Sequence, residues 1–443
     1  MERQGSGYEP SWNGPSPVEL MPSRLAGYHR LLALPASVAA AAPFATYLAA
    51  SSLTLFGDSL FEMAVIWHIM EATGSAAVVG GVAAAIQLPV ALSAAFAGVL
   101  ADRWSRKKLI VFSKVARGSV VASVFLFYRL GVLTPWHLLA VGVLDSFIQV
   151  LGGAASTAVI PNLVDRERVM TANSWLEGIR TGTPIAAQGL AGLIIAATGI
   201  AGAAGITSTL FLAGAGLFAL IADVRYGGGG SKGRRLTGRV FAVEFWNGLR
   251  QALRSRAVRW LMLVGLVTNL LIAGPIFVLM PFYASTVLEA GASGYGYMKA
   301  AMTVGSLIGA LVVGRFGRRM TVGAWLGVGI GVLGALLASL SFSPSLWVAC
   351  ILWAVVGICL PIVNIPVFTA LQLSTPDDRR ARTMTVFMTL AGASTPASLA
   401  LVGQAVRVAG IEGTFLATGL LVTLVGIGAW IWRSRFEIAA TSW

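Results

Sequence analysis

The chain has 443 residues, of which 56% are hydrophobic and 11% are charged, and its mean hydropathy is +0.79. A soluble protein carries about a quarter of its residues as charged side chains, so this composition excludes an ordinary water-soluble enzyme. The net charge of +14 does not indicate nucleic-acid binding, because the Lys and Arg residues gather in alternate loops between apolar stretches.

Twelve apolar stretches are long enough to cross a membrane, since a spanning helix needs about 20 mostly apolar residues. They cover 44–68, 76–100, 108–129, 134–160, 171–197, 201–222, 258–286, 294–314, 321–341, 346–373, 383–406 and 412–432. The predicted fold class is therefore an all-α membrane protein with twelve transmembrane helices.

The positive residues predict how these helices are oriented. Of the 32 Lys and Arg residues, 26 lie in one set of alternate loops and tails, whereas the opposite loops hold Arg129 and Arg407. Short loops that are rich in Lys and Arg stay in the cytoplasm. Both ends of the chain are therefore expected in the cytoplasm. The polar start of the chain lacks the apolar core of a cleavable signal peptide, so we expect the first helix to be retained.

The stretches divide the chain into five parts. Residues 1–43 are expected to be a cytoplasmic segment that is partly disordered, and residues 435–443 a cytoplasmic tail. Residues 44–222 and 258–434 each form a predicted six-helix bundle. Residues 223–257 form a basic cytoplasmic linker, whose Gly-rich start is typical of a flexible chain.

An amphipathic helix is predicted in the second part of this linker. Its apolar side chains share one helical face, and the arginines lie elsewhere; the apolar set is Phe241, Phe245, Trp246, Leu249 and Leu253. We interpret it as a helix that lies on the inner leaflet of the membrane. A target for a calmodulin-like protein or for nucleic acid is the alternative.

Four carboxylates fall well inside predicted helices: Asp58, Glu62, Asp145 and Glu177. A charge at the centre of a spanning helix costs about 2.5–3.5 kcal/mol on insertion scales, so such residues usually face a cavity or a partner. Asp58 and Glu62 are four residues apart and share a helical face. Gln149 lies one turn from Asp145 on its face. The alternative is a structural acid that is hydrogen-bonded by a neighbouring helix.

The junction between the second and third stretches has a counterpart in the second half of the chain. Residues 98–108 place an aspartate among several basic residues, and residues 310–320 repeat the basic residues 212 positions later, with Gly314 at the position of Asp102. The same offset relates Pro184 to Pro396. A single offset without gaps indicates two six-helix halves related by duplication, which is a common construction of transporters.

Charges in the third and fifth stretches are interpreted as gating or structural charges. Arg117 has no acidic residue near it in the sequence, so we expect it to pair with Asp102, Asp145 or Glu177 of another segment. Glu177 and Arg180 are three residues apart and can pair within one helix.

Prolines and asparagines complete the set of candidates. Proline kinks a helix because it removes a hydrogen bond. The expected kinks are Pro184, Pro396, Pro361 and Pro366. Broken helices in transporters usually border a cavity.

Two asparagines are polar candidates for the cavity wall. They are Asn269 in the seventh stretch and Asn364, which lies between two of these prolines in the tenth.

These features resemble the major facilitator superfamily. The chain has twelve predicted spans, a long basic loop after the sixth, and the superfamily's signature in the loop between the second and third spans. The residues that carry the signature are Gly98, Asp102, Arg103, Arg106 and Lys107. A closer resemblance, to the drug:proton antiporter branch with macrolide efflux proteins and the enterobactin exporter, is carried by residues 51–76, 160–178 and 245–265.

The resemblance implies roles for the candidate residues. In this superfamily helices 1, 4, 7 and 10 line a central cavity, which would bring Asp58, Glu62 and Asp145 into one space. Neighbouring carboxylates in a low-dielectric site resist simultaneous ionisation, which suits a group that takes up and releases a proton. Asp58 is the expected proton carrier, and Glu62 and Asp145 would assist it or bind a cationic substrate. The signature residues would form a conformational latch, with Asp102 near the positive N-terminus of a helix of the second half.

The implied function is secondary active transport, with export of hydrophobic or cationic small molecules in exchange for protons by alternating access. A lipid flippase or a metabolite or siderophore transporter of the same fold is the alternative. Thr183 stands before Pro184 where antiporters of the superfamily carry glycine, which weakens the prediction of export relative to uptake.

The expected partners are a small-molecule substrate, protons and membrane lipid, without nucleic acid, and the expected protein is a monomer in a prokaryotic plasma membrane. No enzyme is expected, since the sequence has no nucleophile elbow and no phosphate loop. No metal and no cofactor are expected either. Cys350 and Cys359, nine positions apart in one apolar stretch, do not have the spacing of a zinc site.

Overall fold

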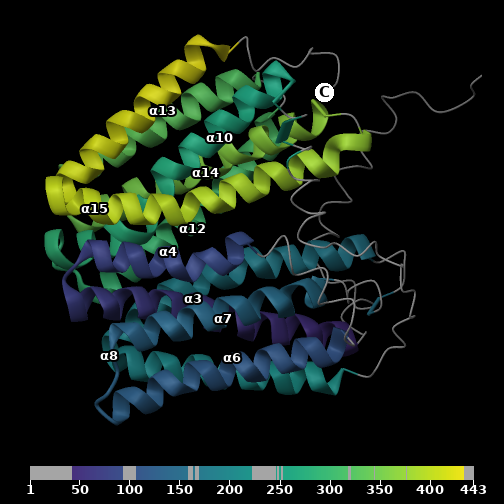
Figure 1. The fold of residues 1–443 in the computed structure, drawn as a ribbon, viewed down its shortest axis with the longest axis vertical. Helices are drawn as coiled ribbons and strands as arrows, with labels where there is room; N and C mark the ends of the chain where they lie inside the picture. The colour runs from purple at the N-terminus through teal and green to yellow at the C-terminus, as the bar shows by residue number, and fades with distance from the viewer. Residues whose placement is uncertain are drawn as a thin grey trace, which may run out of the picture.

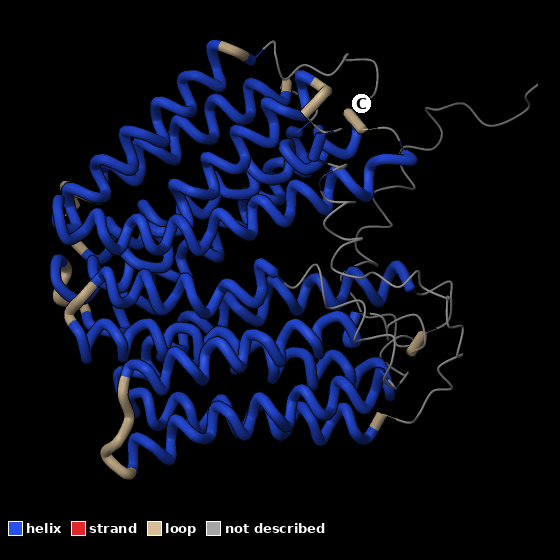
Figure 2. Tube along the Cα trace, in the orientation of Figure 1, coloured by secondary structure: helices blue, strands red, loops and turns tan. Residues whose placement is uncertain are grey.

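The computed structural model describes most of the chain between residues 42 and 433. The described residues are 42–92, 106–157, 163–164, 169–221, 246, 249–250, 253–317, 321–343, 345–375 and 377–433. Within them every regular element is a helix (Figure 2). The N-terminal segment, the C-terminal tail and most of the predicted amphipathic helix lie outside the described residues.

The first half of the chain forms one group of helices (Figure 1). Its members are α3 (Ala42–Thr73), α4 (Ala76–Leu92), α6 (Arg106–Arg129), α7 (Pro135–Thr157) and α8 (Val169–Leu220). Helix α8 breaks at Gly199, whose φ of 63° is a left-handed conformation that favours glycine. Ala172 before the break and Phe218 after it both pack in the cluster that contains Phe44. Helix α8 is therefore a hairpin whose two arms return to the same end of the molecule.

The second half forms another group with the same kind of hairpin (Figure 1). Its members are α10 (Arg256–Gly274), η4 (Pro275–Leu279), α11 (Met280–Phe282), η5 (Tyr283–Val287), α12 (Gly291–Phe316), α13 (Val322–Leu340), α14 (Leu346–Leu373) and α15 (Asp377–Ile431). Helix α15 breaks at Gly410, with a φ of 71°. Phe387 before this break packs on Gly265 of α10, and Trp432 beyond the helix lies 5.5 Å from Trp260, centroid to centroid.

These helices have the composition of membrane-spanning segments. Among the described residues, nine helices are long and apolar enough to cross a membrane, and α4 contains a shorter apolar helix, Ala76–Val90. Many large apolar side chains, such as Trp136 and Trp347, are exposed on the outside of the protein. A helix satisfies its own backbone hydrogen bonds, as lipid requires. The protein is thus an all-helical, multi-pass membrane protein.

The two ends of the molecule differ. One end, called the turn end, carries the glycines with positive φ: Gly74, Gly131, Gly199, Gly291 and Gly410. The opposite end, called the terminal end, carries the start of α3 and the end of α15 (Figure 1). The two groups of helices lie close at the turn end and diverge towards the terminal end (Figure 1).

Glycines allow this close approach at two contacts between the groups. In the contact of α8 with α12, a Cβ atom on Gly192 would lie 2.6 Å from the carbonyl oxygen of Ala292. In the contact of α4 with α15, a Cβ atom on Gly403 would lie 2.6 Å from the carbonyl oxygen of Ala76. Gly80 of α4 faces the same contact. The turn end is therefore sealed by backbone packed against backbone.

Candidate functional site

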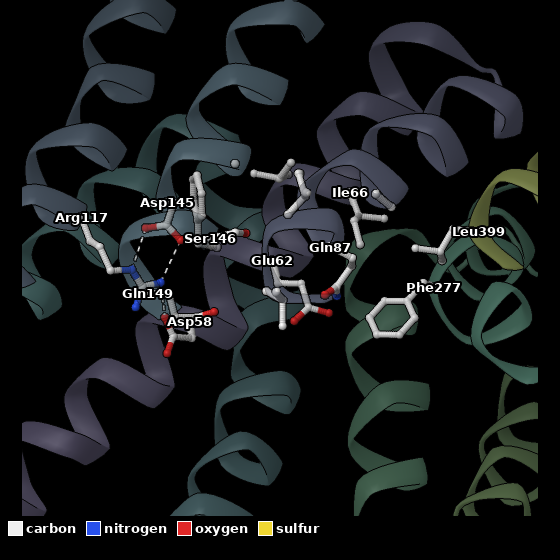
Figure 3. A pocket seen from close by; sticks show the side chains of 16 residues that line it. Asp58, Glu62, Ile66, Gln87, Arg117, Asp145, Ser146, Gln149, Phe277 and Leu399 are labelled. Atoms are coloured by element: carbon white, nitrogen blue, oxygen red, sulfur yellow. Dashed lines mark hydrogen bonds and ion pairs between the residues drawn. The ribbon is translucent and has the colours of Figure 1, made fainter. Parts of the chain in front are cut away.

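A pocket between the two groups of helices is lined by several charged residues, of which Arg117 and Asp145 are buried (Figure 3). Its empty space, including the part continuous with solvent, is about 710 Å³. The first group supplies all of its lining except Phe277 from η4 and Leu399 from α15. The polar lining consists of Asp58, Glu62, Gln87, Arg117, Asp145, Ser146 and Gln149.

Arg117 of α6 joins two acidic residues from two other helices. Its Nε donates to one carboxylate oxygen of Asp145 and an Nη to the other, both at 2.8 Å. The same Nη donates to Asp58 at 2.5 Å. Asp145 is one of the three partners considered from the sequence, whereas the contact with Asp58 is additional. The three residues form a charge triad at one side of the pocket, in which Arg117 and Asp145 are buried and Asp58 is partly exposed (Figure 3).

The first half of the chain fixes the position of this guanidinium. The ring of Phe211, from the second arm of α8, lies 4.3 Å from the guanidinium carbon. An aromatic face attracts a cation in this position. The same ring packs against Gly57, next to Asp58, where a Cβ atom would lie 2.9 Å from it. A larger residue at position 57 would push Asp58 and Arg117 apart.

The two aspartates are not equivalent. Asp145 receives two hydrogen bonds from Arg117 in a bidentate arrangement, which is the stronger kind. Asp58 receives one, and 22% of its side chain is exposed compared with 10% for Asp145. Lys114 lies one turn before Arg117, close enough to interact electrostatically with both aspartates. Asp58 is therefore the carboxylate whose charge can be neutralised with the smaller loss of contacts.

Glu62 lines the same pocket but belongs to a different ion pair. Its carboxylate lies 3.6 Å from Nζ of Lys299, which belongs to α12 of the second group. Sequence reasoning missed Lys299 as a site residue. The available signal was a lysine at position 299 within the predicted eighth apolar stretch, 294–314, without an acidic residue nearby in the sequence.

Gln149 lines the pocket beside Asp145, but the two predicted asparagines do not. The side-chain amide of Asn269 donates to the carbonyl oxygen of Ala391 and to Oγ of Ser394, both at 2.8 Å. It therefore ties α10 to α15. Asn364 is exposed on α14 and is not among the residues of this pocket.

The proline kinks remain predictions. Helix α14 continues as one helix through Pro361 and Pro366. Within α8 and α15 the non-helical dihedral angles occur at Gly199 and Gly410, whereas Pro184 and Pro396 lie in helical backbone. The predicted seventh span contains two π-helical turns, η4 and η5.

The remaining candidate charges lie apart from the pocket. Glu177 and Arg180 approach within 3.9 Å, and both are exposed, so the pair contributes little to stability. Of the signature residues, Gly98, Asp102 and Arg103 lie outside the described residues, and Arg106 is the first residue of α6. Lys107 is half-buried in the first turn of α6. The latch remains a prediction.

Comparisons with known proteins agree with this architecture. The family model described as Major Facilitator Superfamily matches residues 47–392 and 288–442. The multidrug efflux pump Tap of Mycolicibacterium fortuitum is 28% identical over 382 residues, which are 84% of this chain and 91% of Tap. Macrolide efflux protein A of Streptococcus pyogenes is 25% identical over 403 residues, 87% of this chain and 94% of that protein. The crystal structure of a nucleoside transporter has the same fold, with a TM-score of 0.69 at 14% identity over 90% of this chain and 99% of that one.

Proposed function

The chain belongs to the Major Facilitator Superfamily of transport proteins, and we propose that it exports hydrophobic or cationic small molecules in exchange for protons. The resemblance to macrolide efflux proteins is confirmed by the match to macrolide efflux protein A. Efflux is the activity named for both Tap and that protein, and each match covers more than four fifths of this chain, which supports export as the direction.

The charge triad is the observation that supports the proposal of proton coupling. Three carboxylates and one arginine line the pocket, so its wall has a net charge of −2 when all four are ionised. A proton on Asp58 makes the wall less negative and therefore less attractive to a cation. Because Asp145 keeps its two hydrogen bonds, Arg117 stays neutralised when Asp58 is protonated. Proton and cationic substrate thus exclude each other, which is what antiport requires.

We further propose that the chain crosses the membrane twelve times. Each of the hairpins α8 and α15 would supply two spans, η4, α11 and η5 would extend the span of α10, and α4 would complete the set. The distribution of Lys and Arg supports a cytoplasmic terminal end and an outer turn end. The pocket is then closed from the outside in this conformation. The membrane is proposed to be a prokaryotic plasma membrane, and the protein a monomer.

Labelling of single cysteines tests this orientation. In a background of Cys350→Ser and Cys359→Ser, a membrane-impermeant maleimide should label Val132→Cys at the turn end of intact cells. The same reagent should label Thr441→Cys in the tail only after the cells are permeabilised. Labelling of Thr441→Cys in intact cells would reverse the proposed orientation.

Substitution of Asp58 by asparagine tests the coupling. The amide keeps the shape of the side chain but cannot bind and release a proton, so efflux driven by an imposed pH gradient should fall by about tenfold or more, as expected for a lost proton-transfer group. Exchange of substrate across proteoliposomes without a gradient should persist. The measurement is the uptake of tetraphenylphosphonium into proteoliposomes with and without the gradient.

The matched control is Glu177→Gln, which removes an exposed carboxylate outside the pocket and should leave transport unchanged. If Asp58→Asn protein at normal expression retained full gradient-driven transport, Asp58 would not be the proton carrier.

A further inference from the structure

A lysine of the second group of helices forms an ion pair with a carboxylate of the pocket. Lys299 of α12 is 4% exposed, and its Nζ lies 3.6 Å from Glu62 of α3. The ring of Phe277, from the π-helical turn η4, lies 4.6 Å from the same nitrogen. The ammonium group therefore sits between a carboxylate and an aromatic face, and it connects the two groups of helices.

The surroundings of Lys299 are aromatic and not fully hydrogen-bonded. Tyr295 lies one turn before Lys299 on the same face of α12 and is fully buried. Its hydroxyl has no hydrogen-bond partner, although it interacts electrostatically with Lys299. The ring of Tyr295 stacks on Trp67 of α3, with centroids 6.1 Å apart. Few polar contacts therefore compete with Glu62 for the ammonium group.

The site has the chemistry that recognises an organic cation. A carboxylate opposite an aromatic face attracts cations, including those that cannot donate a hydrogen bond. The Glu62 side chain is 45% exposed and lines the pocket, so a ligand in the pocket can reach it, whereas Lys299 approaches from the buried side. The separation of 3.6 Å exceeds the roughly 2.7–2.9 Å of a strong charge-assisted hydrogen bond. The lysine can therefore be displaced.

We propose that Lys299 is an internal substitute for the exported cation and sets the specificity of the pocket: it occupies Glu62 until a lipophilic organic cation displaces it. This inference rests on the proposed export function. A ligand without positive charge leaves the Glu62–Lys299 pair intact and occupies the rest of the pocket.

Displacement of Lys299 also has a consequence for the conformation. Once a cation binds to Glu62, the charge of Lys299 stays buried without its carboxylate partner. The ring of Phe277 and the hydroxyl of Tyr295 still interact with it. A buried charge without a counter-ion is unfavourable. Separation of α12 from α3 exposes Lys299 to water and removes this penalty. Binding of a cation therefore favours opening at the turn end.

Binding of tetraphenylphosphonium to the purified full-length protein tests the specificity. Lys299→Gln removes the competitor and should tighten binding by about tenfold, because Glu62 becomes available without displacement. Glu62→Gln should weaken binding by about tenfold or more. The control is Glu177→Gln, which removes an exposed carboxylate outside the pocket and should leave the affinity unchanged.

Spin labels across the turn end test the conformational consequence. The labels are placed at Ala72→Cys of α3 and Ala409→Cys of α15, both exposed, in the background without native cysteines. In the otherwise unsubstituted protein, tetraphenylphosphonium should lengthen the distance between the labels. In the Lys299→Gln protein the cation should bind without changing this distance, because no buried charge is left unpaired.

A charge exchange separates recognition from simple structural pairing. Glu62→Lys combined with Lys299→Glu keeps an ion pair between the groups, so the distance between the labels should stay short, but tetraphenylphosphonium should not bind. Binding restored by the exchange, or unchanged in both single variants, would overturn the inference. Absence of cation binding by the unsubstituted protein would overturn it as well. The proposed function would then still be supported by proton-driven efflux of the neutral dye Nile red, and it fails if neither probe is exported.

Discussion

Replacing Arg117 by methionine is expected to abolish transport and to destabilise the protein strongly. Asp58 and Asp145 would lose their shared hydrogen-bond donor in a site where the Asp145 side chain is 10% exposed. Removing one partner of a buried ion pair typically costs about 3–5 kcal/mol, because the remaining charge is left uncompensated. The melting temperature in detergent and gradient-driven efflux in proteoliposomes measure the two effects.

The control is a variant that removes all three charges of the triad, so that stability and transport can be separated. A triple variant with Arg117→Met, Asp58→Asn and Asp145→Asn contains no unpaired charge in the triad, so part of the lost stability should return, while Lys114 loses its interaction with both aspartates. Transport should remain absent, because no proton carrier is left. An Arg117→Met protein that melts at the normal temperature would show that the triad is not buried in the membrane-embedded protein.

Adding one methyl group at Gly80 is expected to reduce efflux by about tenfold or more by preventing closure of the turn end. A Cβ atom at this position would fall on the carbonyl oxygen of Leu399, and backbone atoms cannot move aside as a flexible side chain does. The clash exists only while α4 and α15 are in contact, so Gly80→Ala should shift the protein towards the state that is open at the turn end. The spin-label pair at positions 72 and 409 measures this shift.

The neighbouring glycine provides the matched control. A Cβ atom on Gly81 would meet no atom within 4 Å, so Gly81→Ala should leave transport unchanged. Its expected effect on stability is a gain of up to about 1 kcal/mol from helix propensity. If Gly80→Ala and Gly81→Ala behaved alike, close packing of α4 on α15 would not control the conformation.

Apolar runs and loop composition were sufficient to predict where the helices lie. The predicted gaps at 198–200 and 407–411 contain Gly199 and Gly410, where the hairpins turn. Pro184 and Pro361 lie in helical backbone, which a membrane helix can keep around proline when neighbouring groups compensate for the missing hydrogen bond. The π-helical turns η4 and η5 depend on packing against other helices, which a single sequence does not contain.

The site was predictable in its composition but not in its pairings. The high cost of a charge in a membrane identifies Asp58, Glu62 and Asp145 as residues of interest. Which of them Arg117 contacts depends on the rotation of four helices around the pocket. Lys299 was missed because a lysine near the end of a helix can extend to the membrane surface. Asn269 donates a hydrogen bond to α15 and does not line the pocket. The sequence could not distinguish the two, because an amide can form hydrogen bonds with a neighbouring helix or in a polar cavity.

The unequal lining of the pocket constrains how transport can be driven. Because the first group supplies every polar lining residue, a bound molecule keeps its ionic contacts when the second group swings away with Phe277 and Leu399. The bound molecule therefore stays with the first group, and the change in its ionic surroundings between the two sides of the membrane is the competition of Lys299 for Glu62. Rearrangement alone then yields only downhill exchange. Accumulation against a gradient must come from a change in the charge of the wall itself.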